Sequence, residues 1–149
     1  VPVALVPLVM VAMNLVYAAS AYPFGRLADR WDHATLLAWG LGALIAADAA
    51  LALAQGWAAL GAGVALWGLH MGMTQGLLAT MVADVAPPDL RGTAYGVFNL
   101  GSGIAMLVAS AVAGGLWSAF GSSTTFWAGA GFASLCLVVT AVRRRGRGS

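Results

Sequence analysis

The stretch Gly25-Arg26-Leu27-Ala28-Asp29-Arg30 lies between two long apolar runs and concentrates charge in a chain that has little of it. A second ionic segment, from Asp84 to Gly92, interrupts apolar sequence further along. Only 8% of the 149 residues are charged, whereas 61% are hydrophobic. Rare charges grouped between long apolar runs are typical of the loops that connect membrane-spanning helices.

The composition predicts an all-α membrane protein. The mean hydropathy is +0.88, which exceeds what the core of a soluble domain of this length can bury. A spanning helix needs about 20 mostly apolar residues. We expect five transmembrane helices in a bundle over residues 1–142, followed by a basic tail over residues 143–149. The predicted spans are residues 1–22, 36–54, 57–83, 93–117 and 124–142.

The seven basic residues are all arginines, and their positions predict the orientation. Five crossings place segments 23–35 and 84–92 and the tail on one face, where every arginine lies. An excess of arginine marks cytoplasmic loops, so we expect the chain to start outside and to end in the cytoplasm. The tail directly follows Val142, which favours a membrane stop over a nucleic-acid-binding segment. We therefore expect no nucleic-acid partner.

The sequence contains no pattern of a soluble enzyme. It lacks paired catalytic carboxylates, Cys/His metal spacing, a phosphate-binding loop and a nucleophile elbow. We accordingly expect no enzymatic activity, no cofactor and no metal. The single Cys136 cannot form an internal disulfide. Val1 opens directly into apolar sequence without the basic segment of a signal peptide, which favours a truncated chain.

Small residues predict where helices pack closely. Gly68, Gly72 and Gly76 recur every four residues on the third span. Ser102, Ser110 and Gly114 keep one face of the fourth span small. Such stripes let backbones approach each other where lipid gives no hydrophobic drive for association.

The segment 25–30 resembles the loop motif between the second and third helices of each six-helix half of major facilitator superfamily (MFS) transporters. The stretch Asp84–Gly96, with Arg91 and Gly92, is similar to the segment before the fifth helix of a half. The resemblance implies helices eight to twelve of a twelve-helix transporter, part of its C-terminal six-helix bundle, with the N-terminal half missing. One departure follows Arg30, where the family's glycine and basic pair are replaced by Trp31, Asp32, His33 and Ala34.

The resemblance implies a gate at this loop. We expect Gly25 to allow a close turn and Asp29 to face the positive N-terminal end of a neighbouring helix. Arg30 with Asp84, and Arg91 nearby, are expected to form an ionic cluster. The alternative is that these residues are ordinary helix-end charges, whose pairs contribute only about 0 to 1 kcal/mol.

Helical phase predicts a second site at membrane depth. Trp67, His70, Met71 and Thr74 fall on one face of the third span, opposite its glycines. In the family this span is the tenth helix, which lines the substrate cavity, so we expect these residues to line it. His70 is a candidate for proton coupling, since histidine changes charge near neutral pH. It is equally suited to a hydrogen bond with a neighbouring helix.

Asp48 is the only carboxylate well within a predicted span. A charge at that depth costs about 2.5 to 3.5 kcal/mol, so Asp48 needs a proton, a partner or water. Counted from the outer turn, it lies about 10 Å above His70, which argues against a direct pair. It is a second candidate for proton coupling, with a structural hydrogen bond as the alternative.

The predicted function is secondary active transport of small molecules by alternating access, and proton-coupled efflux across the bacterial inner membrane is the first hypothesis. The expected partners are the lipid bilayer, a small-molecule substrate and the missing N-terminal half. Two alternatives remain open: an ion-coupled uptake symporter of the same fold, and a non-transporting membrane scaffold or fragment.

Overall fold

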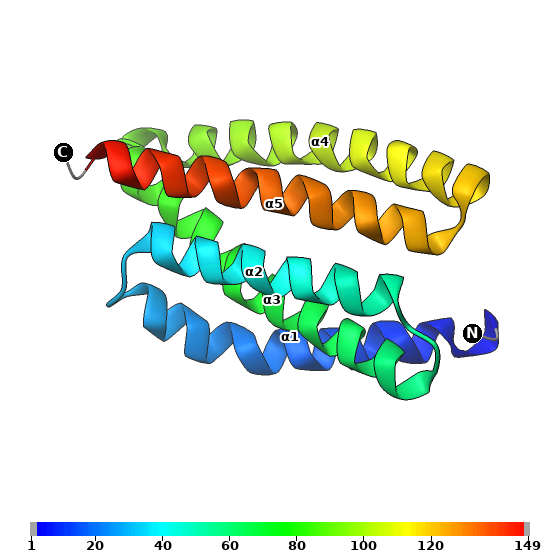
Figure 1. Ribbon diagram of the computed structural model, residues 1–149. Coiled ribbons are helices and arrows are strands. Elements are labelled where there is room, and N and C mark those ends of the chain that lie inside the picture. The colour runs from blue at the N-terminus through cyan, green and yellow to red at the C-terminus, as the bar shows by residue number, and fades with distance from the viewer. Residues whose placement is uncertain (1–2, 148–149) are drawn as a thin grey trace.

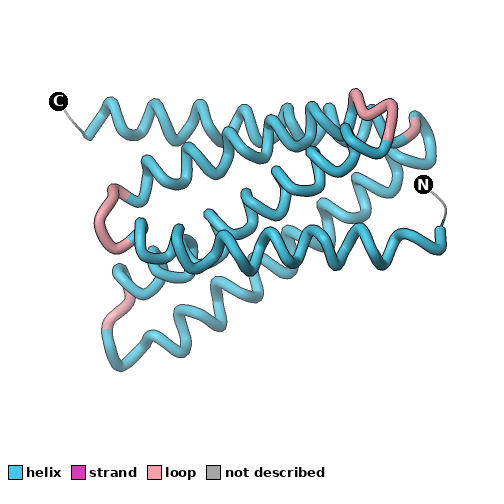
Figure 2. Tube along the Cα trace, turned by 90° about the horizontal axis from the view of Figure 1, so that it is seen from below, coloured by secondary structure: helices cyan, strands magenta, loops and turns pink. Residues whose placement is uncertain are grey.

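The computed structural model describes the backbone of residues 3–147 and the side chains of residues 4–143 (Figure 1). A short 3-10 helix at Val3–Leu5 leads into α1 (Val6–Ala28), followed by α2 (His33–Ala52) and α3 (Trp57–Val85). A second 3-10 helix, Pro88–Leu90, precedes α4 (Arg91–Phe120) and α5 (Ser122–Arg147). The long helices lie roughly along one common axis (Figure 2). Their connections alternate between the two ends of the bundle, so successive helices run in opposite directions. The prediction of an all-α fold with five membrane-length helices is confirmed.

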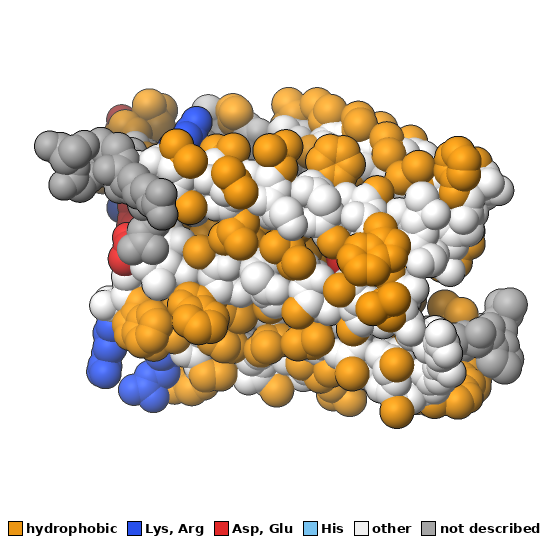
Figure 3. Space-filling model, viewed as in Figure 1, with side chains coloured by type: hydrophobic (Ala, Val, Ile, Leu, Met, Phe, Trp, Pro, Cys, Tyr) orange, Lys and Arg blue, Asp and Glu red, His pale blue; other side chains and the backbone are white. Residues whose placement is uncertain are grey.

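The surface of the bundle suits a bilayer. Within the described part of the chain, four helices are both long and apolar enough to cross a membrane, namely α1, α2, α4 and α5. Helix α3 has 29 residues but is not among the four. It packs extensively against both α1 and α2, so protein contacts replace lipid around its more polar sequence. On the face shown in Figure 3, exposed side chains are mostly hydrophobic, and charged ones gather at one end.

Helix α1 is longer than expected. We predicted a break from Pro23 onward, but α1 continues through Pro23 to Ala28. Proline has no N–H to donate to the carbonyl four residues earlier, yet membrane helices tolerate this loss. The chain turns after Ala28 instead, where the amides of Arg30 and Trp31 donate to the Leu27 carbonyl at 3.1 and 2.9 Å. At the far end, α5 runs to Arg147, so the predicted tail begins as helix, and residues 148–149 lie outside the described residues.

Two glycines of the predicted stripe bring α3 against α1. A Cβ built at Gly68 would lie 2.6 Å from the backbone oxygen of Met13. One at Gly72 would lie 2.9 Å from the Cβ of Ser20 and closer still to its hydroxyl. Gly76 has no such neighbour within 4 Å. Close packing therefore depends on two of the three glycines.

Helix α2 joins α3 to α5. Ala47 is fully buried, and Ala130 and Ala133 of α5 are nearly so, which places small side chains between α2 and α5. At the end opposite the charged loops, the Ser123 hydroxyl donates to the Ala52 carbonyl at 3.0 Å. These contacts hold α5 beside α2 along their lengths.

Helix α4 is the least covered element. It contacts α5 and, less, α3, and it contains no buried residue. Its small face, expected to pack closely, has no close neighbour within the described residues: Ser110 is exposed, and a Cβ at Gly114 would meet nothing within 4 Å. The face that the sequence marks for packing is therefore open in this chain.

Candidate functional site

Helices α2 to α5 line a partly open cavity of about 710 Å³, called here the bundle cavity. Asp48 lines it from α2, and Trp67 and His70 line it from α3, so both polar residues predicted at membrane depth face one space. The other walls are apolar surfaces of α4 and α5, which include Val108, Val112, Leu116, Phe126 and Phe132. An apolar space with a few convergent polar groups is the usual form of a small-molecule site.

Asp48 is the most unusual group in the bundle cavity. Its side chain is only 4% exposed, and no hydrogen bond or ion pair reaches its carboxylate from the described residues. Gly129 of α5 lies directly against it, since a Cβ there would be 2.7 Å from Oδ2 of Asp48. A buried carboxylate without a protein partner needs a proton, a cation or water. The bundle cavity, which Asp48 lines, offers space for any of these.

His70 is held by the neighbouring helix. Its Nδ1 lies 2.7 Å from the Gly40 carbonyl oxygen of α2, within hydrogen-bond distance. The other ring nitrogen, Nε2, takes no part in this bond, and the His70 side chain lines the cavity. Of the two roles weighed from the sequence, the hydrogen bond to a neighbouring helix is present, and proton coupling stays a prediction.

The other two cavity residues expected on α3 are placed differently. Thr74 is 6% exposed, its hydroxyl donates to the His70 carbonyl at 2.8 Å, and its methyl group packs at Gly40. Met71 is half-buried and is not part of the cavity wall. Thr74 does not line the bundle cavity because α2 covers it, and Met71 does not line it either. A place for both in the substrate cavity of a longer protein stays a prediction.

Aromatic rings form one end of the bundle cavity. Trp67 and Phe126 meet edge to face with their centroids 6.3 Å apart. Phe126 also meets Trp117 of α4 in an edge-type contact at 6.2 Å. Aromatic pairs of this geometry contribute about 0.5 to 1.5 kcal/mol beyond the area they bury. They link α3, α4 and α5 at the wall of the cavity.

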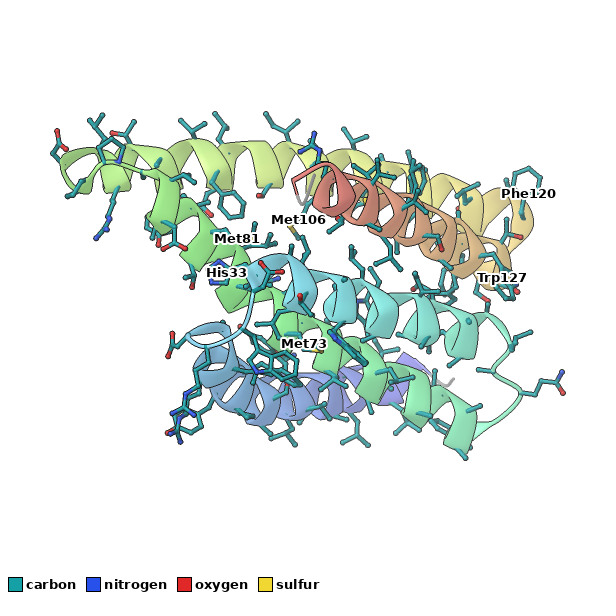
Figure 4. All side chains as sticks on the ribbon, turned by 60° about the vertical axis from the view of Figure 1, so that its left-hand side comes forward. His33, Met73, Met81, Met106, Phe120 and Trp127 are labelled. Atoms are coloured by element: carbon teal, nitrogen blue, oxygen red, sulfur yellow. The ribbon has the colours of Figure 1, made fainter. Side chains whose placement is uncertain are left out.

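The charged end holds the predicted gate residues, but in a different pairing. Asp84 pairs with His33, whose Nδ1 lies 3.5 Å from Oδ2 of Asp84, and not with Arg30 as expected. Figure 4 shows His33 at the start of α2, beside α3 near Met81. Arg30 and Arg91 are exposed. The expected ionic cluster is replaced by one pair that joins α2 to α3.

The loop itself is built without a glycine turn. Gly25 lies inside α1 and has no positive φ, so the close turn predicted there was wrong. Asp29 is exposed at the C-cap of α1. Asp32 caps α2, because its carboxylate accepts from the backbone amide of Thr35 at 3.0 Å and from its hydroxyl at 2.9 Å. Gly92 lies in the first turn of α4.

Sequence reasoning missed four contributors to these sites. Gly129 and Phe126 on α5 complete the bundle cavity, and Gly40 on α2 receives His70. Glycines were sought only on the third and fourth spans, although α5 also carries Gly129 and Gly131. His33 was noted only as a departure from the loop motif, yet it forms the pair with Asp84.

Comparison with known proteins gives one family. A family model for the Major Facilitator Superfamily matches residues 1–148. A curated relative, an uncharacterised MFS-type transporter of Methanocaldococcus jannaschii, is 31% identical over 106 residues. That match covers 70% of this chain but 26% of the relative, so the chain spans about a quarter of that protein.

Solved structures show the same architecture. A mutant of the peptide transporter POT, crystallised with alafosfalin, matches 90% of this chain with a TM-score of 0.76 and 28% identity. The chain covers 28% of that transporter. A crystal structure of the same mutant with sulfate matches 92% of the chain with a TM-score of 0.71 and 24% identity, and it supports the fold alone.

Proposed function

The chain belongs to the Major Facilitator Superfamily, and from that premise we propose that it is one part of a secondary active transporter that moves small molecules by alternating access. In this proposal the bundle cavity belongs to the substrate pathway. The observation that carries it is Asp48, a buried carboxylate without a partner on an apolar and aromatic cavity wall. Secondary transporters bind substrate and coupling ions near the middle of the membrane between helices.

The chain is proposed to supply helices eight to twelve of a twelve-helix protein. Its length relative to the curated and solved relatives supports this, since it covers 26% and 28% of them. The open small face of α4 also supports it, because a surface suited to close helix packing needs a neighbouring helix. The remaining helices, including the N-terminal half, would complete the wall of the pathway.

The coupling ion is proposed to be a proton, and export is the proposed direction. Protonation neutralises Asp48 and removes the cost of burying its charge, whereas a deprotonated Asp48 attracts a cationic substrate. Exchange of a proton for a cation at one carboxylate gives antiport without a second site. His70, held by Gly40 at 2.7 Å, is proposed to accept or donate a hydrogen bond in the same cavity.

The proposed location is the bacterial inner membrane, with the charged end and the C-terminus in the cytoplasm. The described arginines support this orientation, because Arg26, Arg30, Arg91 and Arg143 all lie at helix ends on one side of the bundle (Figure 1). Asp29 and its neighbours at this end are proposed to close the inner side of the transporter against the other half.

Peptides are a second candidate substrate class. The support is the match to the structure of the peptide transporter POT, at 28% identity and a TM-score of 0.76. The cavity chemistry fits part of a peptide, since Asp48 suits its amino terminus and the aromatic rings suit apolar side chains.

The test is a flux assay with the full-length protein in proteoliposomes, with and without an imposed pH gradient. The substrate panel contains apolar organic cations, dipeptides and neutral analogues of the same size. The variant Asp48→Asn removes the charge while keeping the shape, and Gln55→Asn, at an exposed position of the turn between α2 and α3, is the control.

We expect gradient-driven flux of cations in the wild type and in Gln55→Asn, and loss of gradient-driven flux in Asp48→Asn. Flux of dipeptides alone selects the second substrate class. Substrate that enters together with protons indicates an uptake symporter. Absence of flux for the whole panel supports a scaffold, and wild-type coupling in Asp48→Asn refutes the role of this carboxylate.

A further inference from the structure

A second hollow lies on the outside of the bundle, between α1 and α2, and is called here the outer groove. Its volume is about 740 Å³. The groove exists because α1 and α2 each pack extensively against α3 but have little direct contact with each other. They converge only where Ala28, Leu36 and Leu77 form a buried cluster near the charged end.

The walls of the outer groove are apolar and aromatic. Leu69 and Met73 of α3 line it together with residues of α1 and α2. Gly42 leaves the end of the groove away from the loop open, since a Cβ there would meet no atom within 4 Å. Along α2 the lining runs from Thr35 to Ala43, which is about 12 Å at 1.5 Å per residue. This approximates half of the hydrocarbon core of about 30 Å, so the groove spans about one leaflet.

Amphipathic and cationic side chains stand at the end of the outer groove nearest the loop. Trp31 lines this end and is 50% exposed, whereas Trp39, which is 64% exposed, lines the middle of the groove. Arg26 lies in the last turn of α1, between the lining residues Phe24 and Leu27 in the sequence. Arg30 lies just after the end of α1 and directly before the lining residue Trp31. Hydrophobic and arginine side chains lie next to each other at this end in Figure 3.

The arginines are available to a ligand. Arg26 stacks over the Tyr22 ring at 5.9 Å, and neither Arg26 nor Arg30 forms an ion pair with Asp29 among the described side chains. An apolar channel about one leaflet long, with Trp31 at the end nearest the loop and Arg26 and Arg30 beside that end in the sequence, is complementary to one kind of membrane molecule. We infer that the outer groove binds an anionic phospholipid, with an acyl chain in the groove and the headgroup phosphate at Arg26 and Arg30.

The test is native mass spectrometry of the full-length protein released from nanodiscs that contain equal amounts of phosphatidylglycerol and phosphatidylcholine. Each arginine near an anionic lipid surface favours binding by about fivefold. We expect the wild type to retain phosphatidylglycerol preferentially, and the double variant Arg26→Gln/Arg30→Gln to retain both lipids equally. Equal retention by the wild type, or a preference that survives in the double variant, overturns the proposal.

A second variant tests the groove without changing charge. Gly42→Leu has room for its side chain, which then fills the hollow and should remove the retained lipid. Gly131→Leu is the matched control, because Gly131 is exposed on α5 and also has no atom within 4 Å of a built Cβ. Lipid retained by Gly42→Leu at the wild-type level overturns the proposal, as does equal loss in both variants. Size-exclusion profiles confirm that each variant is folded.

Discussion

The packing of α3 on α1 can be tested with a pair of substitutions four residues apart. Gly72→Ala places a methyl group 2.9 Å from the Cβ of Ser20 and 3.1 Å from the Tyr17 carbonyl oxygen. Ser20 cannot easily give way, because it is buried and its hydroxyl donates to the carbonyls of Val16 and Tyr17 at 2.8 and 3.0 Å. The helices must therefore separate, and such overpacking costs about 1 to 3 kcal/mol.

Gly76→Ala is the internal control for this substitution. It changes the same residue type on the same helix, but its methyl group meets nothing within 4 Å. Alanine is more favourable than glycine in a helix by about 0.5 to 1 kcal/mol, so Gly76→Ala should stabilise slightly. The same propensity gain applies to Gly72→Ala, so the two variants should differ in free energy of unfolding by the overpacking cost alone, about 1 to 3 kcal/mol.

The assay is reversible unfolding of the full-length protein in mixed micelles with increasing sodium dodecyl sulfate, followed by circular dichroism. Gly68→Ala extends the series, because its methyl group would lie 2.6 Å from the backbone oxygen of Met13, which has no rotamer to change. If Gly72→Ala unfolds at the same detergent fraction as Gly76→Ala, α1 and α3 are not in the close contact described above. The reasoning from the glycine stripe then fails.

Three further predictions concern the cavity, the loop and α4. Gly129→Ala places a methyl group 2.7 Å from Oδ2 of Asp48, so it should reduce transport about tenfold or more in the proteoliposome assay. The control Gly131→Ala should transport like the wild type. Equal transport rates in the two variants would show that α5 does not constrain Asp48. Asp29→Asn should lower the transport rate about two- to thirtyfold while leaving membrane insertion intact, and unchanged kinetics would remove Asp29 from the proposed gate. Tyr95→Phe deletes the 3.1 Å hydrogen bond from α4 to the Ala79 carbonyl. This variant should lower the free energy of unfolding by about 0.5 to 1.5 kcal/mol in the micelle titration. An unchanged free energy would show that this hydrogen bond does not form.

The sequence was sufficient for the helices and their order. Every backbone polar group in a bilayer must be satisfied internally, so long apolar runs have few alternatives to the α-helix. The predicted end of the first helix at Pro23 was wrong, because proline usually ends a helix in water but lies inside α1 here. Helix ends depend on which carbonyls find other donors, and that is a local detail that composition does not contain.

The cavity was only partly predictable, for a geometric reason. Helical phase correctly placed Trp67 and His70 on one face, but it could not say that α2 covers Thr74 on that same face. The offset along the membrane argued against a direct pair between Asp48 and His70, and no such pair forms among the described residues. Yet both line one cavity, because a volume of about 710 Å³ is large enough to span that offset. Contacts between helices are non-local, so one sequence specifies faces but not neighbours.

The departure from the family's loop motif has a physical consequence for the proposed gate. The family's basic pair is absent after Arg30. The residues at these positions make two other contacts: Asp32 caps α2, and His33 pairs with Asp84. The Asp84 side chain is 56% exposed, and an exposed ion pair contributes only about 0 to 1 kcal/mol. A helix cap contributes about 1 kcal/mol, and it acts within α2 without linking it to another helix.

The stronger attachment at this end is therefore apolar. Leu36 and Leu77 are 3% and 2% exposed in the cluster that joins α1, α2 and α3, and burying one such side chain contributes about 1.5 to 3 kcal/mol. That cluster lies within this chain, so it keeps the three helices together as one body. In the proposed mechanism, rearrangement at the inner side would occur at surfaces outside this cluster, which include the exposed Asp29 and the open face of α4. A rigid unit with weakly held charges at its edge is what rocking of one half against another requires.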